Sequence, residues 1–318
     1  MKKFLSLSLV LCLLFCGLLC GCKKNGEVRL KDVHYDNAPV SAYAYEIIGD
    51  HAVITGFNAE NTVANIPSKL DSKPVTIVRT GAFKDNNTLN TINLAPSITI
   101  VEKGAFTGCT KLRSVSLPSA LTQIGDEAFA GCTALVSVNF PPELTHIGAR
   151  AFAGCSALET IAFPEKTAYV GAGAFTNTPW LTKQSREFVV ECGALIEYKG
   201  SLETVTVPTD VVVVSAAFSG NKTVKKVVLP NTVETITADA FAGCTSLESV
   251  ALGDHLKTVE DAAFSDCTAL TEIAFPKTIK TIGENAFAGC TALTTIRGKA
   301  GSAAESFAKK HNLAFKKV

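Results

Sequence analysis

Apolar and polar residues alternate in short segments that recur along most of the chain. The segments LRSVSLP (residues 112–118) and LTEIAFP (residues 270–276) both alternate in this way and end at a proline. Alternation is typical of a strand that buries one face, and proline stops a strand because it lacks an amide donor. A second apolar position, always Val or Ile, lies five residues before each of nine regularly spaced phenylalanines. This position favours a second, shorter strand in every unit.

The phenylalanines define the length of the unit. Seven of the eight intervals between them are 23 residues, and the residues are Phe83, Phe106, Phe129, Phe152, Phe175, Phe218, Phe241, Phe264 and Phe287. A unit of this length cannot bury its apolar face alone, so successive units must stack. The pattern therefore predicts a β-rich solenoid of about ten 23-residue coils between residues 43 and 297.

The positions next to the phenylalanine have narrow residue preferences. Alanine precedes every one of them, which indicates a site without room for a larger side chain. Three residues after the phenylalanine stand Asn86, Cys109, Cys132, Cys155, Thr178, Asn221, Cys244, Cys267 and Cys290. A position that accepts Asn, Cys and Thr requires a compact buried group that hydrogen-bonds a neighbouring loop. We therefore expect a structural ladder at this position and no catalytic thiol.

Two other interpretations of the cysteines stay open. Equivalent Cα atoms of stacked coils lie ~4.8 Å apart, within the disulfide range, but parallel side chains keep the Cβ atoms wider apart than the ~3.8 Å that a disulfide prefers. A zinc site needs four converging ligands, whereas a linear ladder diverges. Free thiols are the expectation, and no metal is predicted.

The interval of 43 residues between Phe175 and Phe218 interrupts the repeat. The segment FVVECGALIEY within it predicts a hairpin inserted at about 179–200, and Ile196 is a candidate replacement for the missing phenylalanine. Cys192 lies outside the register of the ladder. The insert either only interrupts the stack or forms a lip for a ligand, because insertions in repeat proteins gather on binding faces.

The outward side chains of the longer strand form a candidate binding face. Eight residues after the phenylalanine these are Thr91, Ser114, Ser137, Thr160, Lys226, Ser249, Glu272 and Thr295. Hydroxyl groups repeated every ~4.8 Å make a flat, hydrogen-bonding surface that suits an extended protein or a glycan. Ser and Thr also pack well as strand ladders, so each residue has a purely structural alternative. Few aromatic residues fall at exposed positions, which favours a protein ligand.

The pattern LxSVxLPxxLTxIGxxAFxGCTxL resembles the BspA-type (Treponema pallidum-type) leucine-rich repeats of bacterial surface proteins, over about residues 43–318. The resemblance implies a leucine-rich repeat array with an N-terminal hairpin cap, which here turns near Gly49. It also implies a C-terminal helical cap at residues 298–318. Ser302 and Glu305 have the spacing of a helix capping box in that segment.

The N-terminus has the layout of an export signal, with two lysines followed by an apolar run from Phe4 to Leu19. The ending LLCGC resembles a bacterial lipobox, which implies cleavage before Cys22 and lipidation of its thiol. An uncleaved membrane anchor and cleavage without lipid are the alternatives. Residues 1–21 are therefore predicted to be a lipoprotein signal peptide and residues 22–42 a tether.

Composition and motifs exclude several classes of function. Lys and Arg number 30 against 29 for Asp and Glu, a balance that does not favour binding to nucleic acid. The five histidines are scattered, and no CxxC, GxSxG or phosphate-binding loop is present. We therefore expect no enzymatic activity and no cofactor.

These patterns predict a non-enzymatic cell-envelope lipoprotein whose solenoid mediates adhesin-like binding to a protein. The family resemblance implies a host matrix protein or a bacterial surface protein as the partner, and a glycan is a second candidate ligand. We expect an exported monomer at the cell surface, in contact with the membrane only through the lipid on Cys22. The alternative is a periplasmic scaffold protein of the cell's own envelope.

Overall fold

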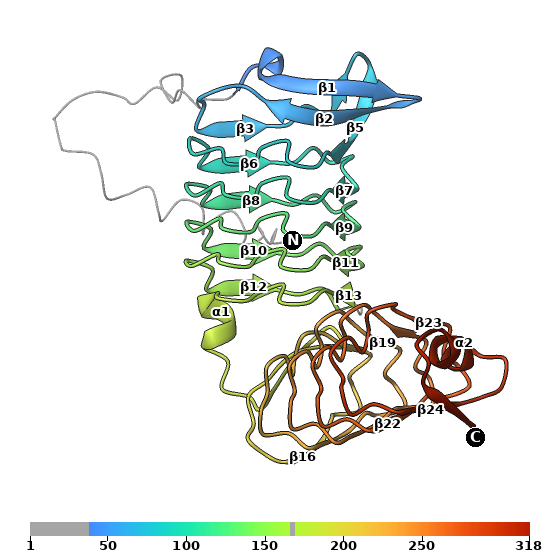
Figure 1. Cartoon of the computed structure of the whole chain (residues 1–318). Helices are drawn as coiled ribbons and strands as arrows, with labels where there is room; N and C mark the ends of the chain where they lie inside the picture. The colour runs from blue at the N-terminus through green and yellow to red at the C-terminus, as the bar shows by residue number, and fades with distance from the viewer. Residues whose placement is uncertain (1–37, 166–168) are drawn as a thin grey trace, which may run out of the picture. The chain divides into compact units, whose positions relative to one another are not determined.

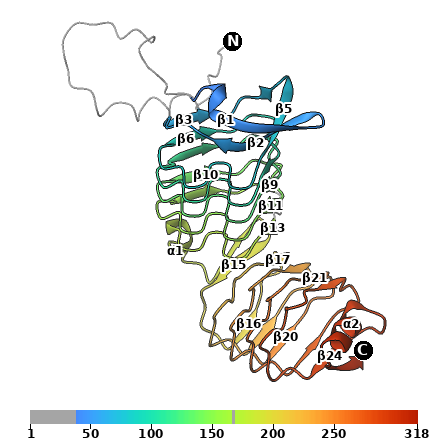
Figure 2. The same ribbon diagram turned by 45° about the horizontal axis from the view of Figure 1, so that its top comes forward.

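Two columns of short parallel strands run through the computed structural model, which describes residues 38–165 and 169–318 (Figure 1). Every coil contributes one strand to each column, and the connecting turns lie between the columns (Figure 2). The prediction of a β-solenoid built from 23-residue coils is confirmed. The predicted signal peptide, Cys22 and most of the tether lie outside the described residues, so their boundaries stay predictions.

The longer strands follow the predicted alternation. Equivalent residues pair in register, as Thr91 with Ser114, and the central side chain points inward while its neighbours face solvent. The column comprises β3 (Val63–Asn65), β6 (Thr91–Asn93), β8 (Ser114–Ser116), β10 (Ser137–Asn139), β12 (Thr160–Ala162), β16 (Thr204–Thr206), β18 (Lys226–Val228), β20 (Ser249–Ala251), β22 (Glu272–Ala274) and β24 (Thr295–Gly298). Pairing along the column is interrupted between β8 and β10, between β12 and β16, and between β20 and β22.

The shorter strands form the second column and carry the buried Val or Ile of the repeat. They are β5 (Lys73–Val78), β7 (Ile100–Val101), β9 (Gln123–Ile124), β11 (His146–Ile147), β13 (Tyr169–Val170), β15 (Ala194–Tyr198), β17 (Val213–Val214), β19 (Thr235–Ile236), β21 (Thr258–Val259) and β23 (Thr281–Ile282). One sheet ends at β13 and another begins at the strand pair β14 and β15. We call residues 43–178 the first stack and residues 194–298 the second stack.

The first edge of the solenoid is covered by a hairpin, as predicted. Strands β1 (Tyr43–Ile48) and β2 (His51–Phe57) pair antiparallel, and Gly49 adopts a φ of 61° in the turn between them. β2 then pairs parallel with β5, which β4 (Lys69–Leu70) joins from the other side. The hairpin thus supplies the pairing that the first coil would otherwise lack.

The C-terminal cap contains the predicted helix, α2 (Ala303–Lys310), followed by a strand that the sequence pattern did not reveal, β25 (Ala314–Lys317). β25 pairs parallel with β24 and extends the column by one strand. The capping box forms only in part. The Ser302 side chain makes no cap hydrogen bond, whereas a Glu305 carboxylate oxygen accepts from the Gly301 amide.

Stacked phenylalanine rings form the axis of the core. In the first stack successive ring centroids from Phe83 to Phe152 lie 4.8–5.1 Å apart, and in the second stack those from Phe218 to Phe287 lie 4.9–5.1 Å apart. The alanine before each ring is buried, which explains its invariance along the chain. Each repeating ring stacks on the rings of the coils before and after it. The contacts of the core therefore run mainly between neighbouring coils.

The interruption contains a short helix and a hairpin. Helix α1 (Pro179–Thr182) was not predicted, and the Thr178 hydroxyl caps it by accepting from the Leu181 amide at 3.3 Å. Strand β14 (Phe188–Glu191) pairs antiparallel with β15, which in turn pairs parallel with β17. The hairpin therefore continues the sheet of the second stack. No helix in the described ranges is long and apolar enough to span a membrane.

Candidate functional site

The ladder cysteines connect neighbouring coils through their thiols. In the first stack the Sγ of Cys109 donates to the Phe83 carbonyl at 3.1 Å, and Cys132 and Cys155 contact the phenylalanine one coil back in the same way. Cys244, Cys267 and Cys290 repeat this contact in the second stack at 2.9–3.1 Å. Each thiol therefore satisfies a carbonyl of the preceding coil.

Asparagine occupies the same position at the start of each stack and closes its own turn. Asn86 and Asn221 belong to the first phenylalanine coil of each stack. The Oδ1 atom of each accepts from the backbone amides two and three residues later, at 2.9–3.0 Å. Thr178 ends the first stack, and its hydroxyl donates to the Phe175 carbonyl of its own coil at 2.8 Å. Cysteine at this position thus bonds to the preceding coil, whereas Asn86, Asn221 and Thr178 bond within their own coil.

The pKa is raised at four of the ladder thiols, namely Cys132, Cys155, Cys244 and Cys267, whereas a hydrogen bond with the Cys267 thiol lowers the pKa of Cys290. Burial raises the pKa of Cys155 to about 12 and that of Cys244 to about 11. A hydrogen bond with the Cys109 thiol, together with burial, raises the pKa of Cys132. None of the seven cysteines of the described part of the chain forms a disulfide, and within that part no cluster of three His, Cys, Asp or Glu side chains is placed to hold a metal. Neutral buried thiols are poor nucleophiles.

The residues of the candidate binding face lie on one side of the long-strand column, but they are not equally accessible. Ser114, Ser137 and Thr160 are exposed, and Thr91 is half-buried. Lys226, Ser249 and Glu272 are exposed in the second stack. The expectation for Thr295 is corrected, because this residue is only 8% exposed where β24 lies beneath β25 and α2.

The first-stack part of this face carries polar side chains that have no partner. Among the described residues, no protein group bonds to the side chains of Ser114, Ser116, Ser137 and Asn139. Threonines at the start of the shorter strands differ, since the Thr122 hydroxyl, for example, donates to the Thr99 carbonyl of the coil before. The four free side chains line a groove of about 300 Å³ where β8 and β10 are not paired. This groove offers donors and acceptors to a ligand without charge.

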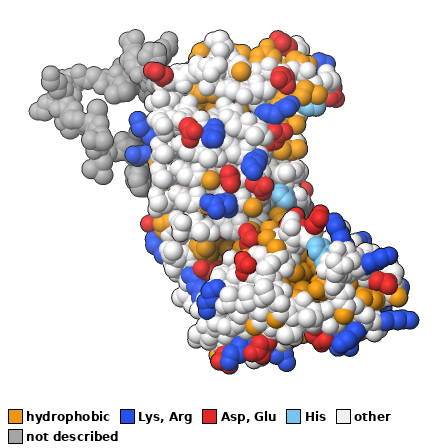
Figure 3. Space-filling view, in the orientation of Figure 1, with side chains coloured by type: hydrophobic (Ala, Val, Ile, Leu, Met, Phe, Trp, Pro, Cys, Tyr) orange, Lys and Arg blue, Asp and Glu red, His pale blue; other side chains and the backbone are white. Residues whose placement is uncertain are grey.

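The second-stack part of the face is charged instead. Lys225 pairs with Glu203 at 2.9 Å, and Arg297 lies 3.5 Å from Glu272. Figure 3 shows red and blue side chains along the lower edge of the molecule, where β16 and β22 run. The long-strand face is therefore neutral and polar in the first stack and charged in the second. The sequence had indicated only that this face contains both kinds of residue.

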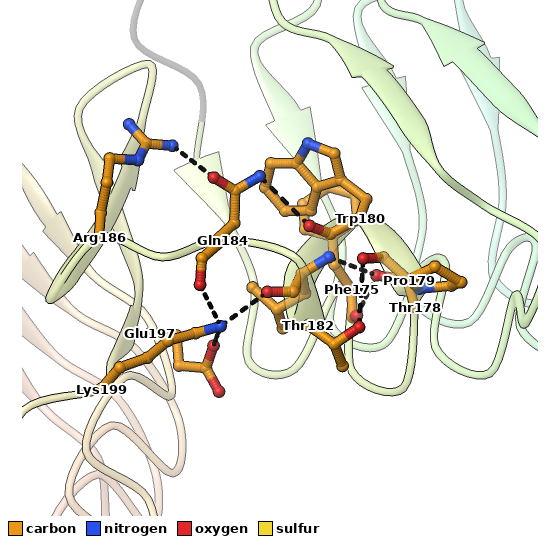
Figure 4. A network of polar contacts seen from close by, with 10 residues as sticks. Phe175, Thr178, Pro179, Trp180, Thr182, Gln184, Arg186, Glu197 and Lys199 are labelled. Carbon is orange, nitrogen blue, oxygen red and sulfur yellow. Dashed lines mark hydrogen bonds and ion pairs between the residues drawn. The ribbon is translucent and has the colours of Figure 1, made fainter.

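The insert is fixed by polar contacts around Lys199 (Figure 4). Its Nζ donates to the Leu181 and Gln184 carbonyls, both at 2.9 Å, and lies 3.4 Å from a Glu197 carboxylate oxygen. Trp180 packs edge-on against Phe175, with ring centroids 5.2 Å apart. A cation at the carbonyl end of α1 is favourable, because the last carbonyls of a helix lack partners within it.

Sequence reasoning missed the residues that join the two stacks. The Tyr169 hydroxyl donates to the Glu260 carboxylate at 2.9–3.0 Å, and that carboxylate also accepts from the Ala238 amide at 2.9 Å. The Ser215 hydroxyl donates to the Val170 carbonyl at 2.6 Å. One signal was available, namely a glutamate at a position where several coils have glycine. The strand position of Tyr169 holds Ile77, Ile100 and His146 in other coils, so its residue type gave no comparable signal.

The aromatic replacement in the interruption also differs from expectation. Ile196 does not occupy the ring position. Tyr198 does, with its ring centroid 5.1 Å from that of Phe218 and its amide donating to the Ala217 carbonyl at 3.0 Å. An aromatic residue preserves the stack of rings, which an isoleucine cannot do.

Comparison with known proteins agrees with this architecture. The sequence profile described as "BspA type Leucine rich repeat region" matches six copies over residues 71–186 and 196–314. Among solved structures, the leucine-rich repeat protein of T. pallidum (TpLRR) is 23% identical, with 88% of this chain and 98% of that chain covered and a TM-score of 0.45. A leucine-rich cell surface protein of Faecalibacterium prausnitzii A2-165 is 21% identical over 83% and 95% of the two chains, with a TM-score of 0.39.

The pneumococcal vaccine antigen PcpA is 22% identical over 80% of this chain and 79% of that chain, with a TM-score of 0.38. No curated protein matches this sequence. The profile covers well over half of the chain, and its repeats coincide with the coils of both stacks. The chain therefore belongs to the BspA-type leucine-rich repeat family.

Proposed function

We propose that this protein is an exported lipoprotein, anchored through Cys22, whose solenoid binds a protein ligand at the cell surface. Leucine-rich repeat solenoids generally serve in protein binding or as scaffolds, and BspA-type members are typically secreted or surface-located. Function in such folds resides on surfaces, because the interior only holds the coils together. The neutral ladder thiols have a structural role in this proposal.

The observation that carries the proposal is the row of free polar side chains on the first stack. The Ser114, Ser137 and Asn139 side chains are exposed, have no partner in the described residues, and line the groove between β8 and β10. Their donors and acceptors are therefore open to a ligand. A flat surface of unpaired donors and acceptors is suited to an extended polypeptide, with complementary groups setting specificity.

Binding to purified extracellular matrix proteins, immobilised one by one, tests the role of this face. We expect the double variant Ser114→Lys, Ser137→Lys to lose at least tenfold in affinity for any matrix protein that the wild type binds, because two long cations would fill the groove. The control Gln123→Lys adds a cation on the exposed side of β9, in the other column, and should bind as the wild type does. Equal loss in both variants would contradict a role for the strand face.

Localisation is tested separately. A fatty acid carrying an alkyne tag should label the wild-type chain but not Cys22→Ala, because the thiol is the proposed attachment site. Protease treatment of intact cells should remove a surface-exposed solenoid. Survival of the solenoid under this treatment, with the lipid present, would instead support the periplasmic scaffold.

A further inference from the structure

The turn that carries the repeating phenylalanine donates backbone hydrogen bonds in one direction only. We call this turn the corner of a coil. In the coil of Phe152 three corner amides donate to carbonyls of the next coil at 2.8–2.9 Å, in the pairs Arg150 to Ala172, Phe152 to Ala174 and Gly154 to Thr176. Other coils repeat this pattern, as Phe106 to Ala128 and Phe241 to Ala263, both at 2.7 Å. The last corner of a stack must therefore be left with unpaired amides.

The corner of Phe175 is such an end. Its carbonyls accept from the coil before, but the amides of Gly173, Phe175 and Asn177 have no acceptor among the described residues. The following corner, at Tyr198, donates forward to Ala217 and does not pair backward. The inserted segment thus leaves the ladder open on one side of the junction. Buried backbone amides are rarely left unpaired in folded proteins unless water or a ligand satisfies them. Phe175 is buried and Gly173 half-buried, whereas Asn177 is exposed.

Gly173 and Phe175 border a half-open cavity of about 410 Å³ between the two stacks, a volume typical of ligand sites. Thr176 and Leu181, which follow in the chain, line it as well, and Ile196 and Ser219 line it from the second stack. Phe175 and Ile196 are buried and give the cavity an apolar floor. The rim carries Arg150 together with Glu197 and Asp239, so charges of both signs surround it.

We propose that this cavity binds an extended polypeptide segment of a partner protein, which supplies the missing row of carbonyls. The amides of Gly173, Phe175 and Asn177 have the spacing that elsewhere matches three carbonyls of one peptide strand. On the opposite side the Ser219 carbonyl accepts no hydrogen bond from the described chain and is available to an amide of the same segment. A rim with both signs of charge favours a neutral backbone over a free anion.

The apolar floor adds a side-chain preference. A segment whose carbonyls meet the corner amides points a side chain toward Leu181 and Ile196, as each phenylalanine of the repeat points into the core. The segment should therefore resemble the repeat itself, with a small residue before an apolar one. This inference rests on the proposed role in protein binding, and it names a subsite separate from the strand face.

A peptide with the sequence of one corner provides the probe. We would measure fluorescence anisotropy of labelled IGARAFAG (residues 147–154), acetylated and amidated, with the full-length chain in detergent. We expect saturable binding to the wild type and at least tenfold weaker binding to Ser219→Trp, because the indole occupies the cavity. Thr176→Trp, from the opposite wall, should weaken binding similarly. Ser219 and Thr176 are exposed, so neither change disturbs the core.

Ser265→Trp is the matched control, since Ser265 has the same register after Phe264 and does not line the cavity. Its affinity for the peptide should stay within twofold of the wild type. Backbone hydrogen exchange adds a direct readout. The Phe175 and Asn177 amides should exchange faster than those of Phe152 and Gly154 in the free protein and should become protected when the peptide binds.

The last corner of the second stack also has unpaired amides. The hydrogen-exchange measurement distinguishes peptide binding there from binding at the corner of Phe175. The Phe287 and Gly289 amides also lack acceptors among the described residues, beside a cavity of about 290 Å³, but Phe307 of α2 already covers Phe287. Protection confined to Phe287 and Gly289, absence of saturable binding, or unchanged affinity in Ser219→Trp would each overturn the inference. Loss of this peptide site with matrix-protein binding intact would leave the proposed function standing.

Discussion

At the scale of single residues, the ladder position shows how one place in the repeat can hold Cys, Asn or Thr. Cysteine stands where a phenylalanine carbonyl of the preceding coil needs a weak donor, and asparagine stands where the turn must be closed locally. The thiol fits because it is small, apolar and able to donate. Its burial also makes stability depend on pH, since an ionised thiol would be desolvated without compensation.

Cys155 provides the pH test. Its folded pKa of about 12 lies above the ~8.5 of an unfolded thiol, so the unfolded state releases the proton first as pH rises. Stability is then unaffected below about pH 8.5 and falls between that pH and about 12. Urea unfolding at pH 7 and at pH 10 measures this effect. Between these two pH values the free energy of unfolding should fall by about 1–2 kcal/mol less in Cys155→Ala than in the wild type. Cys192→Ala, outside the ladder, is the control, and equal pH dependence in all three proteins would refute the argument.

At the scale of the element, the coil is held by close backbone approach as well as by the ring stack. Gly148 lies against the coil before it, where an added Cβ atom would be 2.3 Å from the Asp126 amide nitrogen. In the corresponding place Glu102 instead extends its carboxylate to the Thr80 amide at 2.9 Å. Coils therefore meet either through a bare backbone or through a side chain that satisfies the neighbouring amide.

Gly148→Ala should force two coils apart. We expect a loss of about 1–3 kcal/mol in the free energy of unfolding, because backbone atoms must move to admit the methyl group. Gly56→Ala is the matched control, since its nearest contact would be the Ala44 Cβ atom at an ordinary 3.4 Å. Both would be measured by urea unfolding. Equal stability of the two variants would show that coil spacing is not limited at Gly148.

Phe129→Ala tests how locally the coils cooperate. The ring is fully buried between those of Phe106 and Phe152, and its loss should cost about 3–5 kcal/mol through the cavity left behind. Val136→Ala, at an exposed position of the same coil, should cost little. Hydrogen exchange should accelerate most in the adjacent coils. Uniform acceleration from β2 to β24 would contradict a one-dimensional core.

At the scale of the whole molecule, the interruption divides the hydrophobic core into two clusters that meet near Leu195 and Ile196. The two stacks are joined by Ala194, Ile196 and Val213, which belong to the hydrophobic cluster of the first stack, and by polar contacts such as that of the Tyr169 hydroxyl with the Glu260 carboxylate. Burial and the nearby Glu260 carboxylate raise the pKa of Tyr169, so this hydroxyl stays a donor throughout the physiological range. This junction therefore connects two hydrophobic clusters, within each of which the repeated contacts run between neighbouring coils.

Tyr169→Phe should weaken that junction. We expect a loss of about 1–3 kcal/mol, because the half-buried carboxylate of Glu260 would lose one of its two partners. Tyr45→Phe removes an exposed hydrogen bond to Asp71 and should be nearly neutral. Hydrogen exchange should be faster around β13 and β21 in the first variant only. Unchanged stability and exchange there would show that the stacks are joined by other contacts.

The repeat by itself determined the coil, its two strands and the burial of the ring, because each of these depends on contacts between equivalent positions in successive units. The residue types found at one position of the repeat therefore indicate whether that position is buried and how much room it has. The hairpin over β5 and the helix at Ala303–Lys310 followed from the family resemblance of the flanks. The free side chains of Ser114 and Ser137 were predicted as outward, but the groove between β8 and β10 was not.

Tertiary structure alone decided what happens where the period fails. Thr295 is covered by β25, and Tyr169 meets Glu260 across 91 residues of sequence. Neither contact joins equivalent positions, so no period in the chain encodes them. Tyr198 differs, because it lies 23 residues after Phe175 and the period itself places its ring in the stack, where the sequence analysis had named Ile196 instead. The open amides of Gly173, Phe175 and Asn177 arise because a directional ladder leaves its last donors unpaired and only the arrangement of the neighbouring coils decides whether anything meets them.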